Sequence, residues 1–164
     1  MEEQNFFDKL KDSKKLSEKK REEWFVKFSQ LEKENIIAYS CLSKTAKEID
    51  AIGISVCIHK LISETLQELK VDSTDKIFLD GSLSAPEEFL NQETVIKGDE
   101  KIPVISCASI IAKVLRDRKM TEFHKEFPEY GLDHHKGYGT LKHMEAIRKH
   151  GISEIHRLTY LKNL

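Results

Sequence analysis

The chain has 164 residues, of which 39% are hydrophobic and 34% are charged, and its formal net charge is −1. This length and composition predict one globular domain with a modest core, and they exclude low-complexity, collagen-like and short-repeat proteins. Because no apolar stretch approaches the roughly 20 residues of a membrane span, and because the start Met1-Glu2-Glu3-Gln4 is acidic, we expect neither a membrane protein nor a signal peptide.

The charges are distributed unevenly along the chain. Residues 101–164 contain 12 basic and 7 acidic side chains, whereas residues 1–100 contain 15 basic and 21 acidic ones. Six of the seven histidines also follow position 120. A basic half suits a polyanionic partner such as a nucleic acid, although runs of charge are more often solvated faces. The charge pattern alone therefore leaves both interpretations open.

The cysteines are three in number and scattered, at Cys41, Cys57 and Cys107. They lack the C-x-x-C spacing of zinc sites and the even count of a disulfide framework. We therefore expect buried or neutral thiols in a protein of the reducing cytoplasm.

The first predicted elements are a helix over residues 17–34 and a strand over residues 35–43. Ser17 is a favourable N-cap, and the large apolar side chains that follow recur at helical spacing, at Trp24, Phe25, Phe28 and Leu31. The run that begins at Asn35 is largely apolar and reads as a strand. A second helix is expected to open at Thr45 or Lys47 and to continue to about Lys70.

Two short apolar strands are predicted next, over residues 76–81 and 92–97, and each lies beside a glycine and an aspartate. They are followed by two helices, over about residues 103–127 and 139–150, which the break Pro128–Gly131 separates. Gly151 is a suitable C-cap for the last helix. The alternation of strands and helices indicates an α/β domain that spans residues 1–164 without an internal linker.

Two aspartates follow predicted strands. Asp80 ends the strand that contains Phe78, and Asp99 follows the next strand after one glycine. Side chains at strand ends project into a crevice in α/β sheets, and paired carboxylates there hold hard cations such as Mg²⁺ or Mn²⁺. The alternative is that Asp80-Gly81 and Gly98-Asp99 are only turn formers. Position alone leaves both open.

The predicted helix after Pro103 carries polar side chains on one face. Ser109, Lys113 and Arg116 lie at i, i+4 and i+7, and Ser106 continues the face one turn earlier. Such a stripe can bind phosphate, although an ordinary amphipathic helix has the same pattern. The opposite face, expected to lie in the core, comprises Ile105, Ala108, Ile111 and Leu115.

A basic segment runs from His134 to His143 and places Tyr138 between two glycines. Glycines allow close backbone approach, and a tyrosine offers a flat ring and a hydroxyl group to a sugar or base. The histidines could indicate zinc, but no cysteine or second histidine pair completes a tetrahedral set.

Taken together, these segments resemble bacterial ribonuclease HII, in order and at near-family spacing. The resemblance runs from about residue 10 to the end, and six or more motifs in order are highly specific. The matching segments are Asp12–Arg21, Glu48–Asp50, Leu79–Gly81, Val95–Asp99, Ala108–Val114, Arg116–Arg118, His135–Thr140 and His156–Arg157.

The resemblance implies an endonuclease that cuts the RNA strand of RNA–DNA hybrids and nicks DNA beside an embedded ribonucleotide. Two divalent metals, Mn²⁺ or Mg²⁺, would hold the attacking water and the leaving group. Asp80 and Asp99 match two of the four metal-binding carboxylates of the family. Tyr138 matches the tyrosine that senses the 2′-hydroxyl group. The residues that match phosphate-contacting segments are Lys14, Ser109, Lys113 and Arg116.

The chain departs from the family pattern at its start. Family members begin with a strand that bears an Asp-Glu pair, followed by Gly-Arg-Gly, and the residues before Asp12 show no such pattern. Glu2 and Glu3 lie in no strand-like context and are not expected to substitute. We therefore expect a ribonuclease H-like mixed sheet flanked by helices, with the first strands of its meander missing, a helical C-terminal part, and self-association through an exposed sheet.

Three functional interpretations follow from the sequence. The chain is an active or residually active hybrid endonuclease, whose missing strand is supplied elsewhere or lies upstream of Met1 in the reading frame. Alternatively, it is a catalytically inactive protein that binds hybrids, with an affinity that weakens steeply with salt. The third interpretation is a decayed fragment that folds poorly or persists as an oligomer.

Overall fold

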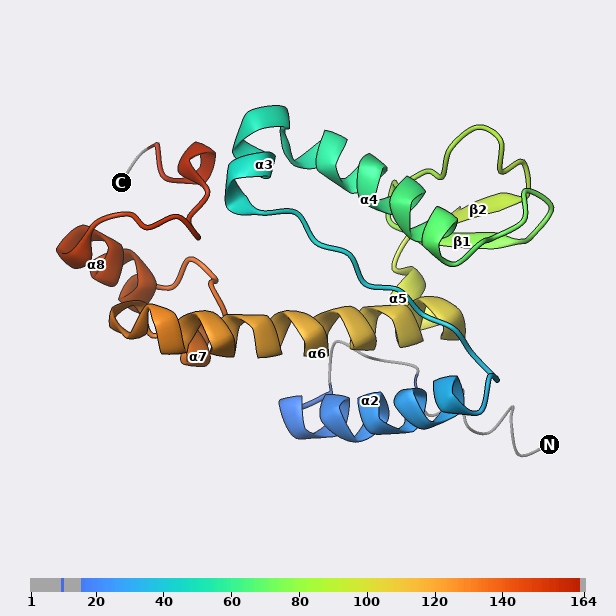
Figure 1. Ribbon diagram of the computed structural model, residues 1–164, viewed down its shortest axis with the longest axis horizontal. Helices are drawn as coiled ribbons and strands as arrows, with labels where there is room; N and C mark the ends of the chain where they lie inside the picture. The colour runs from blue at the N-terminus through green and yellow to red at the C-terminus, as the bar shows by residue number, and fades with distance from the viewer. Residues whose placement is uncertain (1–9, 11–15, 163–164) are drawn as a thin grey trace. The chain divides into compact units, whose positions relative to one another are not determined.

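The computed structural model describes residue Leu10 and residues 16–162 (Figure 1). The chain forms two compact units, each built from two stretches of sequence. The first unit comprises Met1–Leu42 and Ile58–Val114, and the second comprises Ser43–Cys57 and Leu115–Leu164. The single domain expected over residues 1–164 stays a prediction.

The first described helix, α2, spans Glu18–Lys33, as the sequence predicts to within one residue. The Ser17 hydroxyl oxygen accepts a hydrogen bond from the Lys20 backbone N–H at 3.3 Å, which caps an otherwise unpaired donor of the first turn. The buried side chains of α2 are Trp24, Phe25 and Phe28. Helical periodicity and the cap together therefore explain this element.

The segment 35–43 is not a strand, and the prediction for it was wrong. Asn35 adopts a left-handed conformation (φ 56°) after α2, and residues 37–45 have no regular secondary structure. Their contacts are made by side chains: the Tyr39 ring meets the edge of Phe25 at 6.2 Å between centroids, and the Ser40 hydroxyl donates to Glu68. A strand forms only where a second strand supplies backbone partners, and apolar composition does not guarantee one.

The helix expected to extend to about Lys70 is interrupted, so that prediction was wrong in its continuity. Helix α3 spans Ala46–Ile52 and helix α4 spans Ile54–Glu68. Between them Gly53 has φ +83° and ψ 152°, values outside the helical region that glycine adopts without a steric penalty. Thr45 and Glu48 cap each other at the start of α3, which confirms Thr45 as the opening residue.

The two strands predicted around the aspartates are confirmed. Strand β1 spans Ile77–Asp80 and strand β2 spans Gln92–Val95, and they pair in parallel with Asp80 opposite Val95. Alternate side chains of β1 are buried. They form a core cluster with two residues of the following loop, and partly buried side chains of α4 pack against this cluster. Its buried members are Ile77, Leu79, Ala85 and Phe89. The sheet of the first unit therefore has a buried face, as period-two alternation requires.

Residues after β2 form the short helix α5, Gly98–Lys101, and the long helix α6, Pro103–Glu126. The predicted helix from Pro103 is confirmed. Of the side chains expected in its core, Ile105 and Ile111 are buried, but Ala108 is exposed. The buried face also includes Ser106 and Ile110, and the Ser106 hydroxyl group donates to the Asp99 carbonyl inside the core.

The C-terminal elements of the second unit are helical. They are the 3-10 helix η2 (Pro128–Tyr130), helix α7 (Leu132–His135), helix α8 (Leu141–His150) and the 3-10 helix η3 (Leu158–Tyr160). The predicted last helix is confirmed, with Thr140 as its N-cap and Gly151 as its C-cap. The buried core cluster of this unit comprises Tyr130, Leu132 and Ile147.

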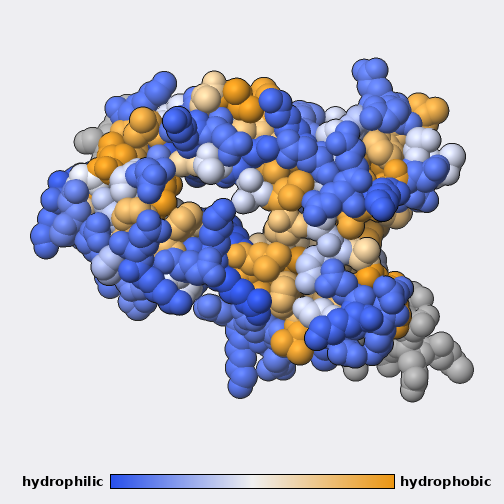
Figure 2. Space-filling model, in the orientation of Figure 1, coloured by the Kyte–Doolittle hydropathy of each residue, from blue (hydrophilic) through white to orange (hydrophobic). Residues whose placement is uncertain are grey.

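The fold is thus α/β, with a helical C-terminal part, as predicted. In the view of Figure 2 the surface is mainly hydrophilic, with apolar patches between hydrophilic regions. Ile96 beyond β2 is 72% exposed and Leu90 is 88% exposed. Self-association through such apolar surface stays a prediction. Among the described residues, no helix is long and apolar enough to cross a membrane.

Candidate functional site

The parallel pairing of β1 and β2 determines where the two aspartates lie. Asp80 is the last residue of β1, and the chain leaves β2 at Val95, directly opposite it, before reaching Asp99 in α5. The Gly98 backbone N–H donates a hydrogen bond to Asp80 Oδ1 at 2.7 Å. This bond ties the first aspartate to the residue that precedes the second, so both carboxylates belong to one end of the sheet.

Gly98 permits this close approach because it lacks a side chain. A Cβ atom on Gly98 would lie 2.5 Å from Ile105 Cδ1 and 3.4 Å from Asp80 Oδ1. The preceding residue, Lys97, has a left-handed backbone (φ 56°), which turns the chain sharply from β2 into α5. The glycine before Asp99 is therefore a packing requirement of this site as well as a turn residue.

Helix α6 contacts the backbone of Asp99. The Ser106 hydroxyl group donates to the Asp99 backbone carbonyl at 2.5 Å, and only 1% of Ser106 and 2% of Asp99 is exposed. Ser106 was expected on the polar face of the helix, and the structure instead gives it a buried positioning contact. Asp99 is buried and Asp80 is half-buried, so neither residue has the exposure of a solvated turn.

The chemistry of this carboxylate pair fits a hard divalent cation. Carboxylate oxygens are the ligands that Mg²⁺ and Mn²⁺ prefer, and one oxygen of Asp80 is already oriented by a backbone donor, as outer-shell contacts orient ligands in metal sites. Among the described residues, no group of three or more histidine, cysteine, aspartate or glutamate side chains is arranged around one metal position. Asp80 and Asp99 thus fit as two ligands of a site that requires others.

Two of the expected phosphate-contacting residues meet on helix α6. The Lys113 ammonium group donates to the Ser109 hydroxyl oxygen at 2.9 Å, across one turn of the helix. Both residues belong to the first unit, as do the two aspartates. The helical spacing predicted from the sequence therefore brings this pair together.

Arg116, another expected phosphate contact, meets Tyr138, the expected sensor of the 2′-hydroxyl group, in the second unit. The Arg116 guanidinium lies 4.4 Å from the centroid of the Tyr138 ring, and its Nη2 donates to the Lys136 carbonyl at 2.9 Å. Tyr138 is 63% exposed, so the ring presents its surface to solvent. Lys14, the remaining expected contact, lies outside the described residues.

Sequence reasoning missed a histidine cluster next to Tyr138. The rings of His135 and His143 stack at 4.4 Å between centroids, and His143 Nε2 lies 3.3 Å from His156 Nε2. Burial lowers the pKa of His143 and of His156 below the usual value of 6.5. The concentration of histidines after position 120 was the available signal, but it does not show which of them meet.

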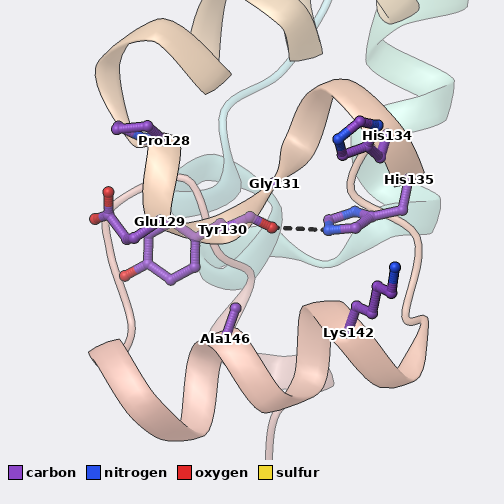
Figure 3. Close-up of a pocket in the computed structure, with 8 residues that line it drawn as sticks. All are labelled: Pro128, Glu129, Tyr130, Gly131, His134, His135, Lys142 and Ala146. Carbon is purple, nitrogen blue, oxygen red and sulfur yellow. Dashed lines mark hydrogen bonds between the residues drawn. The ribbon is translucent and has the colours of Figure 1, made fainter.

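A small pocket lies beside this cluster (Figure 3). Its volume is about 200 Å³, and it is lined by Pro128, Glu129, Tyr130, Gly131, His134, His135, Lys142 and Ala146. His135 points toward the Tyr130 backbone carbonyl, to which its Nε2 is hydrogen-bonded at 2.8 Å. The pocket is smaller than the roughly 300 Å³ at which ligand pockets begin, and it contains none of the residues predicted to bind substrate.

Comparison with known proteins adds an independent result to this geometry. The model of the ribonuclease HII family matches residues 2–163. Ribonuclease HII of Caldicellulosiruptor bescii is 40% identical over 164 residues, which are all of this chain and 77% of that protein. Ribonuclease HII of Clostridium perfringens strain SM101 is 43% identical over 155 residues, which are 94% of this chain and 55% of that protein.

A solved structure is also similar. The structure of the PCNA:RNase HII complex from Archaeoglobus fulgidus includes a chain that superposes with a TM-score of 0.73 at 25% identity. The match covers 98% of this chain and 82% of that one. The predicted ribonuclease H-like fold is therefore confirmed. By its family match over nearly all residues and its identity to these relatives, the chain belongs to the ribonuclease HII family, a family of hydrolases.

Proposed function

We propose that this chain is a divalent-metal-dependent ribonuclease H that hydrolyses the RNA strand of RNA–DNA hybrids and nicks DNA at embedded ribonucleotides. One observation carries the proposal: the parallel strands place Asp80 and Asp99 at the same end of a sheet, joined through Gly98. Family membership supports the reaction class, and the two carboxylates would provide its metal ligands on this chain.

Asp80 and Asp99 would hold the metal ions through their carboxylate oxygens. Bound Mg²⁺ or Mn²⁺ would supply Lewis-acid stabilisation of the phosphodiester and activation of water. The protein contributes the positions of the two ligands. The Gly98 N–H orients the Asp80 carboxylate, and the Ser106 hydroxyl group holds the backbone of Asp99, so both residues would be held in place before metal binds.

The nucleic acid would be bound by side chains of two kinds. Lys113, with Ser109 beside it, and Lys14 would contact phosphates, in keeping with the basic balance of residues 101–164. Tyr138 would pack against the ribonucleotide and sense its 2′-hydroxyl group. Arg116 already contacts the Tyr138 ring and the Lys136 carbonyl, which supports a role in holding the tyrosine in addition to any phosphate contact.

The test is cleavage of a labelled RNA–DNA hybrid by the purified chain with Mn²⁺, with Mg²⁺ and with chelator. We expect cleavage only with metal, and a loss of more than about 100-fold in Asp80→Asn and in Asp99→Asn, the scale on which lost transition-state stabilisation is measured. Glu88→Gln is the matched control, because it also removes one acidic charge, at an exposed site of the same unit.

The same preparation distinguishes the alternatives. Hybrid binding without cleavage under any metal condition would identify a catalytically inactive binding protein. A chain without a cooperative melting transition would instead be a poorly folding fragment. Equal cleavage by the wild type and both aspartate variants would contradict the assignment of the metal site.

A further inference from the structure

Three histidines of the second unit form a continuous set of contacts that ends at Tyr138. His156 Nε2 lies 3.3 Å from His143 Nε2, and His143 Nδ1 lies 3.0 Å from the Tyr138 carbonyl oxygen. The third ring, His135, stacks on His143 at an interplanar angle of 22°. His143 is 6% exposed and His156 is 8% exposed, so water does not replace these contacts easily.

The two ends of the His156–His143 pair are fixed by backbone groups that have only one hydrogen-bonding role. The Ser153 backbone N–H donates to His156 Nδ1 at 3.1 Å, so that nitrogen carries no proton, and the Ser153 hydroxyl group, 2.8 Å from the same nitrogen, can donate to it as well. The Tyr138 carbonyl can only accept, so His143 Nδ1 carries its proton.

The tautomers of both rings follow from these ends. A neutral His156 without a proton on Nδ1 has its proton on Nε2, and a neutral His143 with a proton on Nδ1 has a bare Nε2. The Nε2–H of His156 therefore donates to Nε2 of His143, which is the arrangement that their 3.3 Å contact needs. Each donor of the pair therefore faces an acceptor, and the hydrogen bonds run in one direction, from the Ser153 amide through His156 and His143 to the Tyr138 carbonyl.

His135 obeys the same rule. The Gly137 backbone N–H donates to its Nδ1 at 3.3 Å, so its proton lies on Nε2, which donates to the Tyr130 carbonyl at 2.8 Å (Figure 3). The segment Gly137–Tyr138 is thus held by one imidazole at the Gly137 amide and by another at the Tyr138 carbonyl.

We propose that His143 and His156 are positioning residues, which hold the Tyr138 segment through a directed relay of neutral imidazoles that acid disrupts. A second proton on His143 would place an N–H on Nε2, opposite the N–H of His156. A second proton on His156 would place an N–H on Nδ1, opposite the Ser153 amide, and the Ser153 hydroxyl group would have to rotate to accept it. Either change sets two N–H groups against each other. Protonation of His143 leaves its Nδ1–H donating to the Tyr138 carbonyl but removes the bond from His156 that orients its ring.

The surroundings of the pair favour the neutral rings. The titratable side chains that contact them are His135, stacked on His143, and Tyr130, whose ring meets His156 edge-on at 4.7 Å between centroids. Burial is the main reason that the pKa of each histidine falls below its usual value, and the neighbouring histidine lowers it further. The relay is therefore intact at neutral pH and opens below about pH 6.5.

The consequence for recognition rests on the proposed function, because it requires Tyr138 to contact the ribonucleotide. If it does, acid should weaken binding to a duplex that contains one ribonucleotide more than binding to the same duplex of DNA alone. The expected loss is about fivefold in this ratio, the effect of one neutral hydrogen bond.

The relay itself is tested by nuclear magnetic resonance on the full chain, independently of substrate. Long-range ¹H–¹⁵N spectra should show a proton on Nε2 of His156 and on Nδ1 of His143 at neutral pH. The Tyr138 and Gly137 amide resonances should then move together with the two imidazoles as the pH falls. A charged His156 at neutral pH, the opposite tautomers, or Gly137 and Tyr138 amides that ignore the titration would overturn the proposal.

Two substitutions at one position separate positioning from folding. His143→Asn keeps a donor near the position of Nδ1 and removes the titrating ring, whereas His143→Gln keeps a polar group near Nε2 and loses the bond to Tyr138. We expect the wild-type Tyr138 amide resonance in the asparagine variant, without its pH dependence, and a shifted resonance in the glutamine variant at every pH. The exposed His134→Gln variant, outside the relay, should behave as the wild type.

Binding to the two duplexes completes the experiment. The wild-type ratio should stay constant at neutral pH and fall as the pH drops below about 6.5. The asparagine variant should keep its ratio, and the glutamine variant should have a low ratio throughout. Identical ratios and amide resonances in both variants would refute a positioning role. A wild type that never distinguishes the duplexes would refute the proposed role of Tyr138, while the resonances still decide the relay.

Discussion

Gly98→Ala is the substitution that most directly tests how the carboxylates are placed. The new Cβ atom would lie 2.5 Å from Ile105 Cδ1, although carbon atoms pack at about 3.5–4.0 Å, so at least one of them must move by about 1 Å. Ile105 is 7% exposed and has little space to move. Overpacking of a buried site typically costs about 1–3 kcal/mol, and we expect a loss of that size in the free energy of unfolding.

The same contact can be removed by shortening the Ile105 side chain, so the two substitutions form a double-mutant cycle. Ile105→Val deletes Cδ1 and by itself costs about 0.5–1.5 kcal/mol. With Cδ1 absent, the nearest remaining Ile105 atom is Cγ2, at 3.5 Å from the new Cβ atom, which is an ordinary contact. The double variant should therefore be about as stable as Ile105→Val alone, and metal binding at Asp80 should recover with it.

Urea denaturation of the four proteins measures the coupling, and titration with Mn²⁺ measures the site. Gly139→Ala is the control, because a Cβ atom added at Gly139 would meet open space and the φ of this glycine is not positive. If the two substitutions add to within about 0.5 kcal/mol, the two side chains do not compete for space, and the packing explanation for Gly98 is refuted.

Three further predictions concern single side chains. The pKa of Asp50 is lowered, chiefly by its hydrogen bond from the Thr159 side chain. Asp50→Asn should therefore reduce the free energy of unfolding at pH 7 but not in acid below the folded-state pKa of Asp50, and urea denaturation at both pH values measures this difference. Arg116→Lys should reduce the preference for ribonucleotide-containing duplex severalfold, because an ammonium group does not stack on Tyr138 as a guanidinium does; a binding assay checks this. Burial raises the pKa of Cys107 to about 11, so mass spectrometry after iodoacetamide treatment at pH 7 should find Cys107 unmodified and the exposed Cys41 alkylated.

Elements with local signals were predicted well from the sequence. Ser17 as a cap, Pro103 near a first turn and Gly151 as a stop each act within a few residues, so their helices begin and end close to the predicted positions. The strand expected over residues 35–43 failed because strand formation depends on a partner elsewhere in the chain. Apolar periodicity predicted one continuous helix through Gly53, but the positive φ of Gly53 ends α3 there despite the apolar pattern around it.

The candidate site divides in the same way. Asp80 could be predicted because a carboxylate at the end of an apolar strand is a local pattern, and Ser109 with Lys113 follows from helical spacing. The buried role of Ser106 could not be predicted, because a serine on a polar stripe gives no sign that its hydroxyl group reaches the Asp99 carbonyl. Residues that act through backbone contacts leave little trace in composition or periodicity.

Tyr138 is an example of a residue that is held by such backbone contacts. Its position is not set by the surrounding glycines alone, because its ring is held by Arg116, a residue of α6, and its carbonyl by His143, a residue of α8. His143 is in turn oriented by His156, which lies beyond the end of α8 and does not contact the tyrosine through any described hydrogen bond. Substitution of His156 should therefore alter how the Tyr138 segment is held, and with it the proposed contact of Tyr138 with a ribonucleotide, although His156 itself has no described contact with the tyrosine.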